Sequence, residues 1–233
     1  MKFVLRVDDL GWSANGVRDE GLRLAREMHR ILAGRPYLGA IIPAMLDQEG
    51  KDWLRTRPAN FTPALHGWDH AKARDGVASE YRLCGEGKCR RLIAQGLNEI
   101  GRPIEHMVLP FNAWEPQLEP AAYLEGIRWI WGGGGHDSTS PSPWPTPPQP
   151  YSIGRLGFVP SWKPMYGAVL WQMGPGDSPI KDVVQEARRL PGKAVITLHI
   201  TWEASRKNGL EGIEWLVNQI ADELISATEF LKI

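Results

Sequence analysis

The feature that most restricts the fold is an alternation of short apolar runs with helical patterns along the chain. Phe3–Val7, Phe61–Leu65 and Ile104–Leu109 are apolar runs of strand length. Residues from about 16 to 32, and again from Glu86 to Ile100, repeat apolar side chains at helical spacing. Such alternation predicts an α/β fold whose mostly parallel sheet has its helices outside, either open or closed into a barrel.

The rest of the chain continues this pattern as one domain over residues 1–233. Further strands are expected at Leu38–Met45, Ile127–Trp131, Tyr151–Ile153, Ala168–Gln172 and Ala194–His199, and further helices at Asp47–Arg57, Pro120–Glu125, Ile180–Leu190 and Gly212–Ile225. The segment Ser140–Pro150 is too rich in proline for regular structure, and its Trp144 favours a flap over one end of the domain.

Composition excludes several classes of partner. The 233 residues carry a formal net charge of +0, which argues against nucleic acid and against a basic membrane-binding surface. No apolar run reaches the length of a transmembrane helix. The first residues, MKFVLRVDD, turn acidic before a signal core could form, so we expect a cytoplasmic protein.

Polar residues that suit metal chemistry follow the predicted strands. Asp8 and Asp9 follow the first strand, the sequence LHGWDH places His66 and His70 after the third, and His199 ends the last. In parallel α/β folds the functional site lies beyond the carboxyl ends of the strands. One carboxylate and two imidazoles form a three-ligand set for zinc or a similar ion, with positions left open for water and substrate.

This group of residues predicts hydrolysis of an amide or ester. A divalent ion lowers the pKa of a coordinated water toward about 7 and polarises a carbonyl oxygen. The two adjacent aspartates can divide the work, since one can bind metal while the other faces the water as general base. A histidine across the site can then act as general acid.

Three motifs, in order along most of the chain, resemble those of the polysaccharide deacetylase family. FVLRVDDLG is similar to its first motif, LHGWDH to its metal motif, and VITLHI to its final motif. The resemblance implies Asp8 as catalytic base, Asp9, His66 and His70 as ligands of Zn²⁺ or another divalent metal ion, and His199 as general acid. It also implies a deformed (β/α) barrel with fewer than eight strands and removal of an acetyl group from an amino sugar or short N-acetylated saccharide.

The third motif departs from that family. There an arginine that pairs with the base aspartate stands two residues before a proline–aromatic pair. Here the pair is Pro110-Phe111, but Val108 takes the place of the arginine. Asn112 and Trp114 could rebuild this wall, and the backbone N–H near Phe111 could face a developing oxyanion.

Several alternatives stay open. The two aspartates could only cap a loop, and His199 could belong to the core. Among the 11 tryptophans, Trp68, Trp114 and Trp202 lie in predicted loops where they could stack on a sugar ring. Other functions on the same scaffold are hydrolysis of a non-sugar linear amide or cyclic imide, and a catalytically silent carbohydrate-binding protein that keeps the metal.

Overall fold

One eight-stranded sheet forms the centre of the structure, a computed structural model that describes residues 2–11, 26–56, 58–71, 80–132, 150–160, 188, 192–199 and 209–232. Its strands are β1 (Lys2–Leu10), β2 (Tyr37–Ile41), β3 (Phe61–Leu65), β4 (His106–Val108), β5 (Trp129–Gly132), β6 (Tyr151–Ile153), β7 (Leu156–Pro160) and β8 (Lys193–His199). They are ordered β6-β7-β5-β4-β3-β2-β1-β8.

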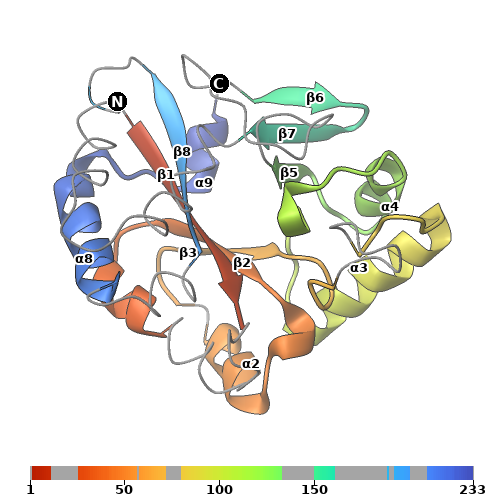
Figure 1. Cartoon of the computed structure of the whole chain (residues 1–233), viewed down its shortest axis with the longest axis horizontal. Coiled ribbons are helices and arrows are strands. Elements are labelled where there is room, and N and C mark those ends of the chain that lie inside the picture. Colours follow the sequence, from red (N-terminus) through yellow and green to blue (C-terminus); the bar gives the residue numbers. More distant parts are fainter. Residues whose placement is uncertain are drawn as a thin grey trace.

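Helices surround this sheet (Figure 1). They are α2 (Gln48–Arg55), α3 (Glu86–Ile100), α4 (Leu118–Leu124), α8 (Gly209–Gln219) and α9 (Ala227–Leu231), with a further helical stretch at residues 26–32. Seven of the described strands run parallel, and only β6 pairs antiparallel, in a hairpin with β7. The predicted α/β class, a mostly parallel sheet with helices outside, is confirmed. The expected number of strands, fewer than eight, is wrong, because the antiparallel strand β6, which pairs with β7 at the edge, brings the described sheet to eight strands.

The strands separate two apolar cores because successive side chains point to opposite faces. On β1, Phe3, Leu5 and Val7 pack with the helices in the larger core. Val4 packs in a smaller core inside the curved sheet, together with Val108 of β4 and Trp131 of β5. Arg6 and Asp8 have the same parity as Val4, which places them on this inner face.

Helix α9 covers the end of the inner core remote from the carboxyl ends of the strands. Its Phe230 belongs to that core, and its ring lies 6.1 Å from the ring of Trp131. The chain enters α9 by a bridge from Leu224 to Phe3, at the start of β1. The interior is therefore filled with apolar side chains at one end, which leaves the other end for polar ones.

Most predicted elements fall close to their observed bounds. β3 and α3 match, while the predicted strand Ile104–Leu109 is shortened to β4. Strand β7 and helix α9 were not predicted. The expected strand Ala168–Gln172, nearly all of the expected helix Ile180–Leu190 and residues 140–149 of the predicted flap lie outside the described residues. Among the helices that the structure describes, none is long and apolar enough to cross a membrane.

A buried histidine makes the stability of the fold depend on pH. Nδ1 of His106 accepts a hydrogen bond from Nε1 of Trp131 at 3.2 Å, and burial lowers the pKa of His106 from 6.5 to about 4. The unfolded chain therefore binds more protons between these values, so the free energy of unfolding must fall as pH drops below about 6.5.

We expect the wild type to lose roughly 2 kcal/mol more stability between pH 7 and pH 5 than the variant His106→Asn. The asparagine keeps an acceptor for Trp131 but does not titrate. Urea unfolding at several pH values measures this difference. Parallel pH profiles for the two proteins would contradict the prediction.

Candidate active site

A β-bulge at the end of β1 allows the side chains of two adjacent aspartates, Asp8 and Asp9, to lie in one site. Opposite β2, three residue steps from Val7 to Leu10 face two steps from Gly39 to Ile41, so β1 contains one extra residue. Asp9, in the bulge, has φ 66°. Regular alternation would send the side chains of Asp8 and Asp9 to opposite faces. Both are almost fully buried, at 1% and 4% exposure, near the same carboxyl end of the sheet.

Asp8 forms a two-pronged ion pair with Arg6, its neighbour on the inner face of β1. Nε and Nη2 of Arg6 donate to Oδ1 and Oδ2 of Asp8 at 2.9 and 2.6 Å. The guanidinium also donates to the carbonyl oxygen of Gly132 and to Oδ1 of Asn112, both at 3.1 Å. Arg6 is 0% exposed, so this ion pair is shielded from solvent and fixes the orientation of the Asp8 carboxylate.

Asp9 lies within reach of the two histidines of the LHGWDH segment. Its Oδ1 is 3.3 Å from Nε2 of His66 and 3.7 Å from Nε2 of His70. One ligand atom from each of the three residues lies within 4.8 Å of the others. Ligands at zinc's usual bond lengths in tetrahedral arrangement are roughly 3.4 Å apart. The three donors therefore fit a single divalent ion.

When the His66 ring is neutral, its hydrogen bonding leaves the metal-facing Nε2 without a proton. Nδ1 lies 3.0 Å from the carbonyl oxygen of Val108, which can only accept, so the neutral ring carries its proton on Nδ1. Metal-binding histidines are commonly oriented in this way. Burial opposes a charge on His66, but its hydrogen bond to Asp9 and the charges of Asp8 and Asp9 together raise its pKa.

Strained backbone is concentrated at this end of the sheet. Asp9, His70, Phe111 and Asn112 all have φ between 56° and 66°, a region that residues other than glycine seldom occupy. The Phe111 ring packs against the His70 ring, with centroids 4.2 Å apart. Such conformations persist only where surrounding contacts hold them, so their clustering favours this end of the sheet as the candidate site.

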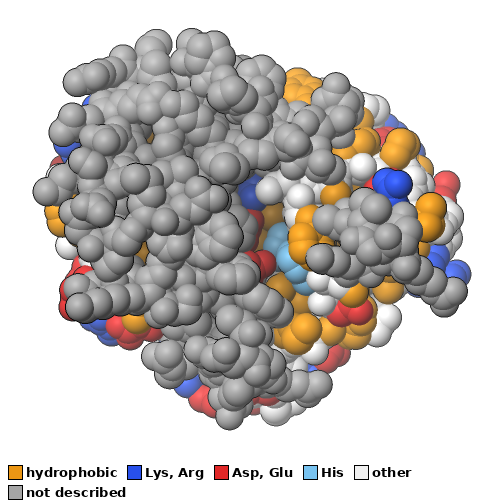
Figure 2. Space-filling view, in the orientation of Figure 1, with side chains coloured by type: hydrophobic (Ala, Val, Ile, Leu, Met, Phe, Trp, Pro, Cys, Tyr) orange, Lys and Arg blue, Asp and Glu red, His pale blue; other side chains and the backbone are white. Residues whose placement is uncertain are grey.

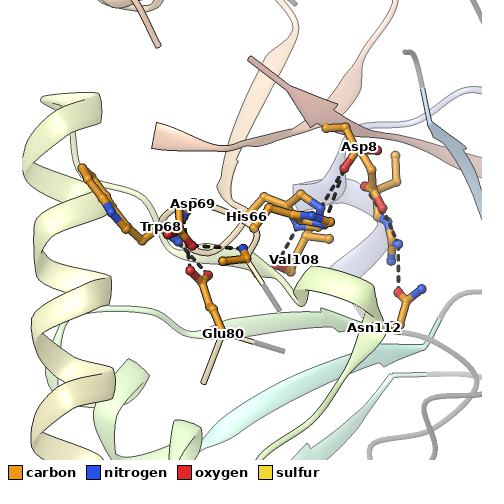
Figure 3. A network of polar contacts seen from close by, with 11 residues as sticks. Asp8, His66, Trp68, Asp69, Glu80, Val108 and Asn112 are labelled. Carbon is orange, nitrogen blue, oxygen red and sulfur yellow. Dashed lines mark hydrogen bonds and ion pairs between the residues drawn. The ribbon is translucent and has the colours of Figure 1, made fainter. Parts of the chain in front are cut away.

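Sequence reasoning missed two residues that the structure brings to the site. Arg6 had a signal, since it is a charge in an apolar strand two residues before Asp8. Glu80 had none, because it contacts the LHGWDH segment from a distant part of the chain. Its carboxylate accepts from the backbone N–H groups of Trp68 and Asp69, and Figure 3 shows it across the loop from His66 and Asp8. Burial, with a hydrogen bond to Asp69, raises the pKa of Glu80 to about 8 despite these N–H donors.

The other predicted site residues lie in several environments. The backbone of His199 pairs in register with Asp8 at the ends of β8 and β1. Asn112 contacts Arg6, as described above. Trp114 packs edge-on against Phe158, at 6.3 Å. In Figure 3 the ring of Trp68 points away from His66. Trp202 lies outside the described residues.

The site opens on a depression in the surface. Figure 2 shows histidine at this depression with acidic and basic side chains beside it and hydrophobic side chains around its described edge. His70 is the more accessible of the two ligand histidines, with 17% of its side chain exposed against 3% for His66. His70 is therefore the ligand histidine that lies nearer the solvent.

Comparison with solved structures shows what fold this site is built on. The chain aligns with a polysaccharide deacetylase from Mycobacterium smegmatis over 97% of its length and 87% of that protein, at 12% identity and a TM-score of 0.67. An acetyl xylan esterase of family 4 from Clostridium thermocellum, in complex with a cobalt ion, aligns over 98% and 89%, at 12% identity and a TM-score of 0.56. No protein-family model and no curated protein match the sequence.

Other neighbours carry different descriptions. A 4-alpha-glucanotransferase from Thermococcus litoralis has a TM-score of 0.66 and 12% identity; all of this chain aligns, but it spans only 40% of that protein. A CE4 family pseudoenzyme from Bacillus anthracis has a TM-score of 0.60 and 10% identity, over 99% of this chain and 65% of that one. At such identities the likeness establishes the fold, a deformed barrel shared with family 4 carbohydrate esterases, and not an activity.

Removal of either ligand histidine is expected to abolish stable metal binding. We expect His66→Ala and His70→Ala to lose most bound zinc in metal analysis of protein reloaded with one equivalent, because only two of the three ligands remain. His29→Ala is the matched control, since His29 lies outside the site, 3.1 Å from the hydroxyl of Tyr37. Full occupancy in both site variants would show that the ligands are wrongly assigned.

The Arg6–Asp8 pair predicts strong coupling in a double-mutant cycle. Arg6→Met leaves a buried carboxylate without its partner and is expected to lower the free energy of unfolding by about 3–5 kcal/mol. Adding Asp8→Asn removes that charge, so the double variant should be less destabilised than the sum of the two single variants. Denaturant unfolding measures the cycle, and strict additivity would argue against the pair.

Proposed function

We propose that this protein is a metal-dependent hydrolase that removes an acetyl group from the amino group of a sugar or short N-acetylated saccharide. One observation carries the proposal: a cluster of Asp9, His66 and His70, of which Asp9 and His66 are buried, lies beside a second buried carboxylate, Asp8, at the carboxyl ends of the strands. The order of its sequence motifs, which resembles that of polysaccharide deacetylases, and the fold of family 4 carbohydrate esterases support the same reading.

The metal is zinc or another divalent ion held by Asp9, His66 and His70. When bound, such an ion polarises the acyl carbonyl oxygen and lowers the pKa of water. The cobalt ion in the Clostridium thermocellum esterase supports a metal in this fold. The hydrogen bond from His66 to Val108 holds the imidazole in the tautomer that presents Nε2 as a ligand.

Asp8 is the general base that takes a proton from the attacking water. Burial strengthens the electrostatic interactions of the Asp8 carboxylate. The two hydrogen bonds from Arg6 fix the plane of this carboxylate and neutralise its charge. In polysaccharide deacetylases an arginine of the third motif does this, and here Val108 stands in its place. We propose that Arg6 fulfils that requirement from β1, with Asn112 bracing the guanidinium.

His199 is the general acid that protonates the leaving amine. Its position supports the role, because it ends β8 in register with Asp8. A backbone N–H near Phe111, in the short segment Pro110–Asn112, is the donor for the developing oxyanion. Water adds to the acyl carbon, the C–N bond breaks, and acetate and a free amine leave.

Substrate recognition is assigned to the aromatic and amide side chains near the site. Phe111, which packs against His70, and Asn112, which contacts Arg6, lie at the site. The further candidates are Trp68, whose ring points away from His66, Trp114, which packs against Phe158, and Trp202, which lies outside the described residues. A cytoplasmic location, expected from the sequence, would supply small or precursor saccharides rather than cell-wall polymers. Neutral net charge agrees with an uncharged or weakly charged ligand.

Two other functions are compatible with the same fold and site. A hydrolase of a linear amide or cyclic imide would use the same metal ligands and base, since the bond that breaks is of the same kind. A catalytically silent carbohydrate-binding protein is favoured by the pseudoenzyme from Bacillus anthracis, which shares the fold.

Acetate release from a panel of N-acetylated sugars by the zinc-loaded protein distinguishes these functions. We expect release by the wild type and a reduction of at least about 100-fold in kcat for Asp8→Asn, with metal content unchanged, because a general base contributes that much. Asp52→Asn, an exposed change on α2, is the matched control.

Release of acetate by Asp8→Asn at the wild-type rate would remove Asp8 from the mechanism. Binding of sugars without release by the wild type would favour the silent protein. Hydrolysis of simple amides or imides alone would favour the hydrolase of a linear amide or cyclic imide.

A further inference from the structure

The loop that carries both ligand histidines has an unusual backbone that must be held by something outside it. Gly67 has φ 71° and His70 has φ 56°, so the chain twice enters the left-handed region within four residues. A non-glycine residue in that region is strained. The position of the His70 imidazole therefore depends on contacts that stabilise this turn.

Two of those contacts hold the start of the loop through the backbone. The N–H of His66 donates to the carbonyl oxygen of Ile41 at 2.7 Å, and the N–H of Ala44 donates to the carbonyl oxygen of Trp68 at 3.0 Å. Both fasten the loop to the end of β2 and the residues after it. They leave the N–H groups of Trp68 and Asp69, which lead into His70, to another acceptor.

Glu80 is that acceptor, and its carboxyl group lies against the backbone of the loop. Its Oε1 accepts from the N–H of Trp68 at 2.7 Å and its Oε2 from the N–H of Asp69 at 3.1 Å. Glu80 is only 8% exposed. A β-carbon on Gly67 would lie 1.7 Å from Oε1 and 2.7 Å from Cγ of Pro110, so glycine is needed there for the carboxylate to enter.

The backbone of Glu80 and of the next residue, Tyr81, is held by side-chain hydrogen bonds. Sγ of Cys84 donates to the carbonyl oxygen of Glu80 at 3.4 Å, and Nε2 of Gln117 donates to the carbonyl oxygen of Tyr81 at 3.0 Å. These contacts link the Glu80 segment to the start of α3 and to the residue before α4. A buried carboxyl group is costly unless its bonds are satisfied, and here they are satisfied by the ligand loop, through the N–H groups of Trp68 and Asp69 and a hydrogen bond with the Asp69 side chain.

We propose that Glu80 is a positioning residue for the metal centre: it holds the turn from Gly67 to His70 so that the His70 imidazole meets Asp9 and His66. It is not a ligand, because both its oxygens face backbone N–H groups, and the metal-binding group found among the described residues consists of Asp9, His66 and His70. The inference rests on the metal-binding part of the proposed function.

Metal affinity of three variants tests this role. Glu80→Gln keeps an acceptor for Trp68 but turns a donor toward Asp69, and Glu80→Ala removes both acceptors. Glu119→Gln is the matched control, because Glu119 also accepts a backbone N–H, that of Arg155 at 3.0 Å, in a contact remote in sequence from the loop. Zinc affinity is measured by competition with a chromophoric chelator, and the fold of each metal-free protein by circular dichroism and thermal unfolding.

We expect affinity to fall in the order wild type, Glu80→Gln, Glu80→Ala, with a loss of about 10-fold or more for the alanine variant while it stays folded. Glu119→Gln should bind as the wild type does. Equal affinity in the folded Glu80 variants would overturn the inference and leave the proposed function intact. Unfolding of both metal-free Glu80 variants at 25 °C would also overturn it, since Glu80 would then support the whole fold. A wild type that binds no zinc would reject the metal centre itself.

Discussion

The ion pair between Arg6 and Asp8 is the interaction on which the arrangement of the site depends. Both groups are buried on the inner face of β1, where an uncompensated charge would be very costly. The guanidinium satisfies Asp8 with two bonds and then reaches Gly132 at the end of β5 and Asn112 after β4. The Arg6 side chain thus connects the carboxyl ends of β1, β4 and β5. The positions of Asp8, of the strained turn at Asn112 and of Gly132 therefore all depend on this one guanidinium.

The metal ligands depend on departures from regular strand geometry. Without the bulge at Asp9, the alternation of β1 would direct Asp8 and Asp9 to opposite faces, and only one could serve the site. Gly67 and His70 bend the next loop in a similar way, held by Glu80. The sheet supplies rigid attachment points, and the irregular residues at their ends aim the side chains. A regular barrel with this sequence would hold the same residues without bringing them together.

Sequence patterns predict the architecture well because it follows from burial alone. The apolar run at Phe61–Leu65 and the helical period of Glu86–Ile100 appear in the structure with unchanged bounds. Short elements were harder, since β7 contains Gly157 and Pro160, and α9 spans only five residues, too few for a clear period. The proximity of the candidate ligands Asp9, His66 and His70 agrees with what their spacing at strand ends predicts. Glu80 was not predictable, because its contact with Trp68 and Asp69 links residues more than ten positions apart and leaves no local pattern.

In the proposed function, Arg6 supplies the charge that the arginine of the third motif supplies in polysaccharide deacetylases. A buried general base requires a positive charge of fixed geometry beside it. Any strand that reaches the same position can supply this charge. The inner face of the barrel offers that position from β1 as well as from β4, because side chains two residues apart on one strand are neighbours. With Arg6 on β1, position 108 is free for a valine, which packs in the inner core while its carbonyl oxygen orients His66. In the proposed function, the valine at position 108 and the charge at Arg6 therefore belong to one arrangement of the site, in which the guanidinium is supplied from β1.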